Sequence, residues 1–452
     1  MNKDHEKSRE IEELDHLLER MFPIARSLTG SGNRKTFEII QELIPLQLHE
    51  YPSGAHVYDW VIPDEWDIRD AFIKDSSGCR VVDYRKCNLH VVGYSEAIHQ
   101  WMDFEDLGPH LHTVKANSTA IPYRTSYYQR DWGFCVTAEQ YQNLQNFGGP
   151  LEVCIDSSFK KDGGMTVGEL LIPGHSSEEY FISTYCCHPS MANDNLSGML
   201  VTTLLARDLL VGPKPRVSWR FIFVPETIGA IAYLFNNEAQ MKEASGGLVV
   251  TTCGGPGPLG YKESFKSNHR IDRAVRLAFR EREVGPVRYR FTPDGSDERQ
   301  YSSPGFRIPV ATITKDKYYE YPEYHTSADN LDFVNGDQLS ASLEIYRDVV
   351  NILDKNATYQ VESGYGEPQL GRRGLYPTTG GALHQGNIDS SVVTQTEIDT
   401  IMWILFCSDG SNDLLSIAEQ SGVKFRDLLA ISERLSAAGL LKRVPLQTTL
   451  HP

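Results

Sequence analysis

Residues 184–198, Thr-Tyr-Cys-Cys-His-Pro-Ser-Met-Ala-Asn-Asp-Asn-Leu-Ser-Gly, mark a change of secondary structure. The run just before them, 179–185, is apolar like a buried strand, and the apolar spacing over 197–210 predicts a helix. His188 and Asp194 lie between the two, where α/β sheets bind ligands. Both are therefore candidate metal ligands, although Asp194 could instead cap the helix and His188 could form an ordinary hydrogen bond.

The flanking chain alternates between strand and helix patterns. Two amphipathic helices, 8–30 and 33–43, and a strand at 46–51 come first. After residue 216, strands are predicted at 217–224, 247–252 and 309–314, and helices at 228–236, 272–282 and 338–353. Such alternation predicts an α/β fold with a mainly parallel sheet flanked by helices.

Residues 57–162 differ in composition from the rest of the chain and are rich in Trp, Tyr, Pro and Gly. Short segments such as 79–84 and 89–94 alternate between apolar and polar residues, as strands do. We therefore expect residues 57–162 to form a mainly β insertion. It could act as a lid or help to select the substrate, or it could be a purely structural insert. The main α/β domain then comprises 1–56 and 163–360, and we expect it to carry the functional site. The Gly- and Pro-rich stretch 361–396 is predicted to be a loop or linker.

Residues 397–452 form a small unit whose three helical segments, 400–406, 414–420 and 424–438, resemble a winged helix-turn-helix. The helical segment at 424–438, which would be the recognition helix, has two basic residues, Arg426 and Arg434, but also two acidic ones, Asp427 and Glu433. The whole chain has a net charge of −16. Nucleic-acid binding needs a basic footprint. We therefore expect docking or homo-oligomerisation through this unit and no nucleic-acid partner.

The composition is that of a globular protein of 452 residues, 40% hydrophobic and 10% aromatic. The sequence has no apolar run of membrane-spanning length and starts with a polar segment, so a cytoplasmic location with no membrane association is the default expectation. Eight cysteines without paired spacing suggest reduced, mostly structural thiols. Cys186 and Cys187 adjoin His188, but neighbouring strand residues point to opposite faces, so ligation by both thiolates is not expected.

Three further stretches carry polar residues at predicted strand ends. Glu226 directly follows the strand at 217–224, Asp297 precedes the strand at 309–314, and His325 and Asp329 follow that strand. Packing alone would favour apolar or capping residues at these places. Histidines and carboxylates gathered at one edge of a sheet favour a metal site there.

These motifs resemble the zinc aminopeptidases of the co-catalytic metallopeptidase fold, over about 160–355 and the two N-terminal helices. In that family a histidine precedes Asp-Asn-x-Ser-Gly, then come Glu-Glu-x-Gly, Ser-Asp-His and Tyr-His-Thr-x-x-Asp. This chain has His188, Asp194-Asn195-Leu196-Ser197-Gly198, Glu226-Thr227-Ile228-Gly229, Ser296-Asp297-Glu298 and Tyr324-His325-Thr326-Ser327-Ala328-Asp329. The whole layout is also similar to bacterial aminopeptidase-like proteins with an inserted β domain and a C-terminal winged helix.

Two departures from the family pattern bear on the metal. The second glutamate ligand falls on Thr227, and the later aspartate ligand falls within 250–255, where there is no carboxylate. The resemblance therefore implies one zinc ion per chain, held by His188, Asp194 and His325, rather than a pair.

The same resemblance assigns Glu226 as general base and places Asp297 near the metal, to orient His325 or to bind a substrate amine. Further candidates for substrate binding are Glu298, Arg299, Tyr324, Arg372 and Arg373. The expected activity is amide hydrolysis by an aminopeptidase acting on a peptide or an amino-acyl compound. Alternatives are a deacylase of a small modified metabolite, and a non-catalytic binding or regulatory protein that uses its winged helix.

Overall fold

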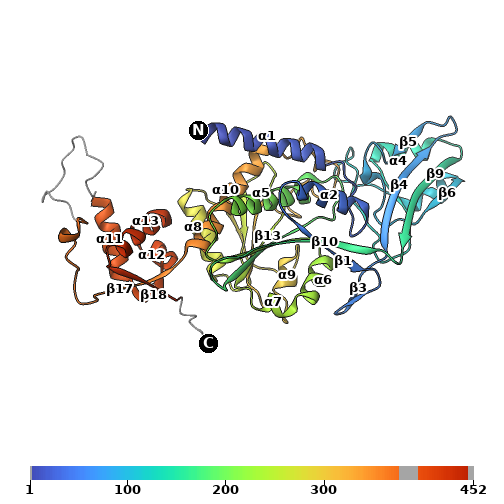
Figure 1. Ribbon diagram of the computed structural model, residues 1–452. Helices are drawn as coiled ribbons and strands as arrows, with labels where there is room; N and C mark the ends of the chain where they lie inside the picture. The colour runs from blue at the N-terminus through green and yellow to red at the C-terminus, as the bar shows by residue number, and fades with distance from the viewer. Residues whose placement is uncertain (1–2, 376–394, 446–452) are drawn as a thin grey trace. The chain divides into compact units, whose positions relative to one another are not determined.

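The computed structural model describes residues 3–375 and 395–445 (Figure 1). The chain divides into two compact units. The first comprises Met1–Asp272 and Pro286–Arg347, and the second comprises Arg273–Gly285 and Asp348–Pro452. Of the predicted linker at 361–396, residues 376–394 lie outside the described part.

An eight-stranded sheet with the order β1-β10-β12-β11-β13-β16-β14-β15 forms the centre of the first unit. Its strands are β1 (Gln47–Pro52), β10 (Gly164–Ile172), β12 (Ser218–Val224), β11 (Glu179–Tyr185), β13 (Gly246–Val250), β16 (Val310–Lys315), β14 (Leu259–Lys262) and β15 (Val287–Tyr289). The four central strands β12, β11, β13 and β16 are parallel, whereas β1, β10 and β14 pair antiparallel. The predicted α/β fold with a mainly parallel sheet is confirmed.

Helices cover both faces of this sheet. In the view of Figure 1, α1 (Lys3–Met21), α2 (Ser31–Gln41) and α5 (Gly198–Val211) lie above it, and α6 (Ile228–Asn236), α7 (Glu238–Lys242) and α9 (Glu298–Tyr301) lie below it. Because strands buried on both faces need apolar side chains throughout, β11 and β12 read as continuous apolar runs. On the lower face, Phe181, Ile222 and Val224 pack with Tyr233 of α6.

The parallel strands end at the same edge of the sheet, which fixes where the polar residues gather. His188 follows β11, Glu226 follows β12, Thr251 follows β13, and the loop that carries His325 follows β16. This edge is where ligands bind in open α/β sheets.

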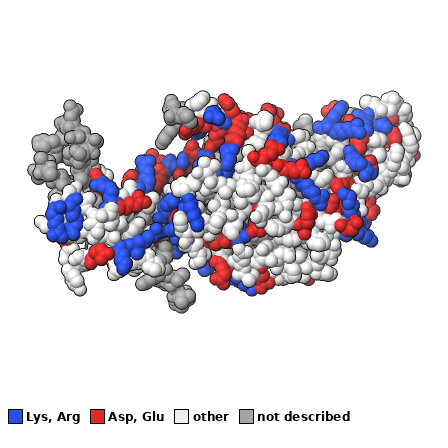
Figure 2. All heavy atoms as spheres, in the orientation of Figure 1, with Lys and Arg blue, Asp and Glu red and all other residues white. Residues whose placement is uncertain are grey.

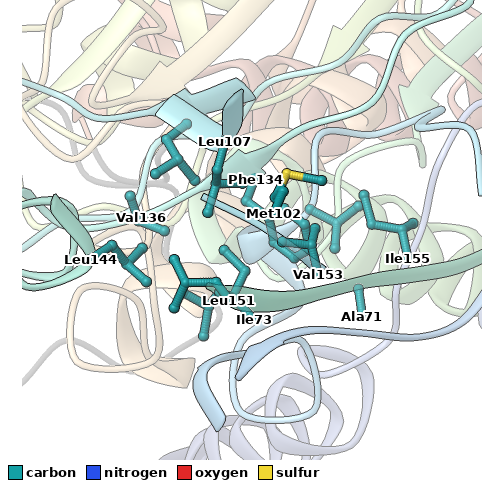
Figure 3. Packing of buried hydrophobic residues seen from close by; sticks show 13 residues of the cluster. Ala71, Ile73, Met102, Leu107, Phe134, Val136, Leu144, Leu151, Val153 and Ile155 are labelled. Atoms are coloured by element: carbon teal, nitrogen blue, oxygen red, sulfur yellow. The ribbon is translucent and has the colours of Figure 1, made fainter. Parts of the chain in front are cut away.

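The insertion folds around a second, four-stranded sheet with the order β5-β4-β9-β6. Its strands are β4 (Glu65–Lys74), β5 (Arg80–Asp83), β6 (Ile98–Met102) and β9 (Leu151–Lys160). In β9 the residues Leu151, Val153 and Ile155 alternate with more exposed ones, so one face of the strand is apolar. Figure 3 shows that face packed against side chains from β4, β6, α3 (Phe104–Leu107) and α4 (Ala138–Asn146).

Smaller elements complete the insertion. They are the two-stranded pairs β2 (His56–Val57) with β3 (Trp60–Val61) and β7 (Leu111–His112) with β8 (Phe134–Cys135). A capping box between Thr137 and Gln140 starts α4. The strand predicted at 89–94 is instead the short helix η1 (Asn88–His90) followed by isolated bridges at Val91 and Gly93.

The second unit contains a winged helix, as predicted. Its helices α11 (Gln395–Cys407), α12 (Leu414–Ser421) and α13 (Phe425–Ala437) accompany the sheet β18-β17-β19. The strands are β17 (Thr358–Val361), β18 (Asp409–Asp413) and β19 (Leu441–Val444). Because β17 is the central strand, the folded unit starts before residue 361.

Two long helices, α8 (Arg270–Glu281) and α10 (Gly336–Lys355), contribute residues to both units. A search of the described helices finds none that is both long and apolar enough to cross a membrane. Acidic and basic side chains are interspersed over the face of the molecule in Figure 2.

Candidate metal centre

The backbone of His188 is held in place by Arg26. Nε of Arg26 donates a hydrogen bond to the carbonyl oxygen of His188 at 2.9 Å, and Nη1 of Arg26 donates to that of Met21 at 2.8 Å. Arg26 is buried, and burial lowers the pKa of its guanidinium to about 10. This arginine therefore ties the end of the N-terminal helix to the loop that carries His188.

Asp194 lies in the irregular helical turn η3 (Ala192–Ser197) between β11 and α5, where its backbone leaves helical geometry. The carboxylate of Asp329 holds this turn. It accepts hydrogen bonds from the backbone N–H groups of Asn193 at 2.6 Å and Asp194 at 2.9 Å, and from the hydroxyl of Tyr321 at 3.1 Å. Because Asp329 follows His325 by four residues, it joins the turn of one candidate ligand to the loop of another.

His325 has a left-handed backbone, with φ of 54°. Residues other than glycine adopt this region at a cost and keep it only where the surroundings fix it. On one side the ring of Tyr324 stacks on the imidazole at 4.0 Å between centroids. On the other side the backbone N–H of Tyr123, from the insertion, donates to the carbonyl oxygen of His325 at 2.8 Å.

The structure brings His188, Asp194 and His325 together, with one potential ligand atom of each within 4.8 Å of the others. Oδ2 of Asp194 lies 3.0 Å from Nε2 of His325. Both atoms are buried, and neither has a hydrogen-bond partner among the described residues. Buried polar atoms normally form hydrogen bonds, so two buried atoms that have no partner beyond this contact with each other fit a missing cation.

The ionisation of His188 and Asp194 also suits a cation. Burial lowers the pKa of His188 to about 4, so its imidazole is neutral at pH 7. Burial alone would favour the neutral acid at Asp194, but His188 and then His325 hold its pKa down at about 2. Two imidazoles and one carboxylate form a common donor set for zinc.

Glu226 adjoins this cluster, with its Oε2 atom 3.9 Å from Nε2 of His188. Its backbone N–H donates to Sγ of Cys187 at 3.3 Å. Burial, followed by the charges of Asp297 and Asp194, raises the pKa of the Glu226 carboxyl well above its usual value. Cys187 also lies within reach of His188 and Glu226, but burial raises the pKa of its thiol far above 9.

Asp297 contacts the residue after Glu226. Its Oδ1 atom accepts a hydrogen bond from the backbone N–H of Thr227 at 2.8 Å, while Oδ2 is buried and has no partner within the described part of the chain. Burial raises the pKa of this carboxyl to about 7. Arg299 donates from Nη2 to Oγ1 of Thr227 at 3.2 Å. Both residues therefore flank the Glu226–Thr227 turn.

The other predicted substrate-binding residues lie in different surroundings. Glu298 is fully buried and accepts hydrogen bonds from Nζ of Lys262 at 2.5 Å and the hydroxyl of Tyr318 at 3.0 Å. Arg372 and Arg373 belong to the second unit, in the short helix η4 (Gly371–Arg373).

Sequence reasoning missed three residues that contact the candidate ligands. Tyr185, at the end of β11, donates a hydrogen bond to Oδ1 of Asp194, and its hydroxyl lies 2.6 Å from Oγ1 of Thr251. Arg26 and Tyr123 are the other two. An arginine after an apolar helix and a tyrosine inside the insertion carry no sequence signal for a site, whereas a tyrosine at the carboxyl end of a buried strand could have been noticed.

Comparison with known proteins agrees with this fold. Residues 357–443 match a family described as winged helix-turn-helix. Two peptidase structures share the fold over about three quarters of this chain at low identity. They are a zinc aminopeptidase from Bacillus subtilis (13% identical, 77% of this chain and 94% of that chain, TM-score 0.56) and a Peptidase M28 precursor from Shewanella amazonensis (12%, 77% and 96%, 0.52).

Nearer relatives come from Clostridium acetobutylicum. One is provisionally described as a polysaccharide biosynthesis protein with an aminopeptidase-like domain, and it is 42% identical over 96% of both chains. A crystal structure of a provisionally described peptidase superimposes with a TM-score of 0.89 at 40% identity, over 97% of this chain and 98% of that chain. Residues 15–356 match the family described as Domain of unknown function (DUF4910), and the chain therefore belongs to that family.

Proposed function

We propose that this protein is a hydrolase of amide bonds that uses one zinc ion, and that it is an aminopeptidase acting on peptides or amino-acyl compounds. The observation that carries the proposal is the pair of buried atoms Oδ2 of Asp194 and Nε2 of His325. They lie 3.0 Å apart, have no other partner among the described residues, and have His188 beside them. The aminopeptidase-like domain in the description of the C. acetobutylicum relative supports the reaction class.

His188, Asp194 and His325 would hold the ion and leave one position open, as in catalytic zinc sites. A bound zinc ion supplies Lewis acidity and activates water near neutral pH. The neutral imidazole of His188 and the ionised carboxylate of Asp194 need no change of protonation to act as ligands. Arg26 and Asp329 hold the backbones of these loops, so the three ligands are arranged in advance.

Glu226 would act as general base and then as general acid. Its carboxylate takes a proton from the attacking water and passes it to the leaving amine. A cation at the three ligands favours the ionised form of Glu226, which opposes the effect of burial on its pKa. The Oε2 atom lies 3.9 Å from Nε2 of His188, beside the proposed ligands, which supports this role.

Asp297 is the best candidate to bind a substrate amine, because its Oδ2 atom is buried and unpartnered beside Glu226 and Thr227. Arg299 donates to Thr227 and Tyr324 stacks on His325, so both remain candidates for contact with the substrate. The carboxylate of Glu298 accepts a hydrogen bond from Lys262, and Arg372 and Arg373 belong to the second unit. The substrate-binding roles predicted for these three residues therefore rest on the sequence alone.

The test combines metal content with turnover. Purified wild type should contain about one zinc per chain by elemental analysis, and His188→Ala and His325→Ala should lose it. Glu226→Gln should keep the zinc, yet lower kcat on the best of a panel of aminoacyl p-nitroanilides by about 100-fold or more. A wild type that binds no metal, or a fully active Glu226→Gln variant, would reject the proposal.

A deacylase of a small modified metabolite is the second candidate. It is favoured by the description of the C. acetobutylicum relative as a polysaccharide biosynthesis protein, since polysaccharide precursors include N-acylated amino sugars. The same metal site and Glu226 would serve that reaction. Adding N-acetylated amino sugars to the substrate panel separates the two, because an aminopeptidase needs a free α-amine and a deacylase does not.

For the winged helix we propose docking to protein rather than binding to nucleic acid. In this unit Arg434 bonds to Glu397, and Arg426 lies 3.6 Å from Asp427. These pairs reduce the basic charge that α13 could offer to phosphates. Light scattering of the intact protein would report a homo-oligomer, and a DNA mobility shift at physiological salt should show no complex.

A further inference from the structure

The β insertion reaches the metal centre through one short segment, residues 121–127. Its residues Ile121 and Tyr123 form a small ladder with the loop that carries His325. Tyr123 donates from its backbone N–H to the carbonyl oxygen of His325, and Ser327 donates to that of Ile121, both at 2.8 Å. The N–H of Ile121 donates to Oγ of Ser327 at 2.9 Å, and Pro122 and Thr326 form an isolated β-bridge.

The side chain of Tyr123 contacts both candidate histidine ligands. Its ring meets the imidazole of His188 edge to face at 5.1 Å between centroids, and that of His325 at 5.2 Å. Tyr324 stacks on His325 in a nearly parallel orientation. The imidazole of His325 is therefore held by Tyr324 across its face and by Tyr123 at a right angle.

The segment itself is anchored away from the site. The hydroxyl of Tyr123 lies 3.0 Å from that of Tyr127, whose ring packs edge-on against Tyr94. The buried hydroxyl of Tyr94 lies 2.7 Å from Oγ1 of Thr29. Gly93 also donates from its N–H to the carbonyl oxygen of Arg124 at 2.8 Å. These contacts join the segment to the N-terminal part of the first unit.

The loop at 316–335 needs such an anchor. It connects β16 to α10 without regular secondary structure and holds His325 at a positive φ. Unusual backbone geometry at a site persists when neighbouring contacts fix it. In this protein those contacts come partly from the insertion.

We propose that Tyr123 is a positioning residue for the metal centre, and that the β insertion therefore forms part of that centre instead of being a detachable lid. The inference rests on the proposed zinc site. It assigns Tyr123 to holding the two histidines in place and not to contact with the ion. Groups that orient metal ligands typically change metal affinity 10- to 100-fold when removed.

The experiment measures zinc affinity by competition with a chromophoric chelator on the full-length protein. Tyr123→Ala should weaken zinc binding about 10- to 100-fold. Tyr123→Phe keeps the ring and should bind zinc like wild type. Tyr128→Ala is the matched control, because Tyr128 lies in the same stretch but is 51% exposed, and it should also bind like wild type.

A second readout separates positioning from general stability. The Co²⁺ complex of Tyr123→Ala should show a changed visible absorption spectrum, which reports the arrangement of the ligands whether or not the metal-free variant melts at a lower temperature. If Tyr123→Ala does not fold, Ser327→Ala replaces it, since that variant removes only the side-chain acceptor of the ladder. Ser327→Ala should also weaken zinc binding.

Unchanged zinc affinity and an unchanged Co²⁺ spectrum in Tyr123→Ala, or in Ser327→Ala where that variant replaces it, would overturn the inference and leave the zinc site standing. A lower melting temperature with an unchanged Co²⁺ spectrum would overturn it too, because the role of Tyr123 would then be structural only. Absence of zinc and cobalt binding in the wild type is a different result. It would reject the proposed function itself.

Discussion

Tyr185 donates a hydrogen bond from its hydroxyl to Oδ1 of Asp194. The same hydroxyl lies 2.6 Å from Oγ1 of Thr251, at the end of β13. One oxygen of Asp194 is thereby occupied, and the other, Oδ2, faces His325. A carboxylate that bridges two ions uses both oxygens, so this arrangement favours a single ion.

We therefore predict that the wild type binds about one zinc ion per chain and that the capacity for a second can be introduced. Tyr185→Phe frees Oδ1 of Asp194, and Thr227→Glu with Thr251→Asp adds two carboxylates at the strand ends. The triple variant should approach two ions per chain in elemental analysis, whereas Tyr185→Phe alone should stay at one. Two ions in the wild type would contradict the role assigned to Tyr185.

Asp329 should matter for both stability and metal binding, although it is not a proposed ligand. Asp329→Asn replaces one acceptor oxygen with an NH₂ group that faces the backbone N–H of Asn193 or Asp194. Leaving a buried donor unpaired costs about 1–3 kcal/mol. Urea denaturation should show a loss of that size in the free energy of unfolding, together with weaker zinc binding.

The control for Asp329 is Asp332→Asn, a nearby exposed residue of the same loop. It should leave the unfolding curve and the zinc affinity unchanged. If Asp329→Asn matched this control in both measurements, the hydrogen bonds of Asp329 would contribute neither to the free energy of unfolding nor to zinc binding.

Most of the fold could be predicted from the sequence because it depends on local periodicity. The helix predicted at 228–236 agrees with α6 at both ends, and the central parallel strands were each found. Because parallel strands have their carboxyl ends at the same edge of the sheet, the sequence predicts that His188, Asp194 and His325 lie together at that edge. The first helix ends at Met21 instead of near residue 30, because Pro23 lacks the N–H that a continuing helix needs.

The remaining features depend on contacts between distant segments. Tyr123 reaches the histidines only because the insertion packs on the loop at 316–335, and no periodic pattern encodes that packing. Glu298 adjoins Asp297 in sequence, so it was expected to face the substrate, but Lys262 of β14 pairs with it. The sequence shows that a lysine and a glutamate are present and does not show that they meet.

Glu65 offers a test of the predicted pH dependence away from the metal centre. Arg34 donates to both of its carboxylate oxygens, at 2.9 and 2.7 Å, and the backbone N–H of Gly164 donates at 3.0 Å. The hydrogen bonds from Arg34 lower the pKa of Glu65 to about 2 from 4.5. A carboxyl whose pKa is lower in the folded state stabilises the fold above its unfolded pKa.

Glu65→Gln should therefore lower the free energy of unfolding by about 1–3 kcal/mol at pH 7. The difference from wild type should shrink as the pH falls from 4.5 to about 2, because Glu65 takes up its proton first in the unfolded state and then in the folded state. Denaturation curves over this range give the measurement, with Glu19→Gln on the exposed side of α1 as control. A difference that stayed constant with pH would mean that the ion pair is not its source.

The last prediction concerns Lys262 and Glu298, a buried ion pair below 2% exposure on both sides. Nζ of Lys262 also donates to the hydroxyl of Tyr318 and the carbonyl oxygen of Asp294, both at 2.9 Å. Removing one partner of such a pair leaves a buried charge without compensation. Lys262→Met should therefore destabilise the protein by about 3–5 kcal/mol.

Replacing both partners removes that penalty, so Lys262→Met with Glu298→Leu should be more stable than Lys262→Met alone. A thermodynamic cycle of the two single variants and the double variant measures the coupling. If Glu298 bound substrate instead, Glu298→Leu would raise KM at unchanged stability and the cycle would show no coupling. Strong coupling would mean that Glu298 supports the loop carrying Asp297, and that Asp297 is the nearer candidate for the substrate amine.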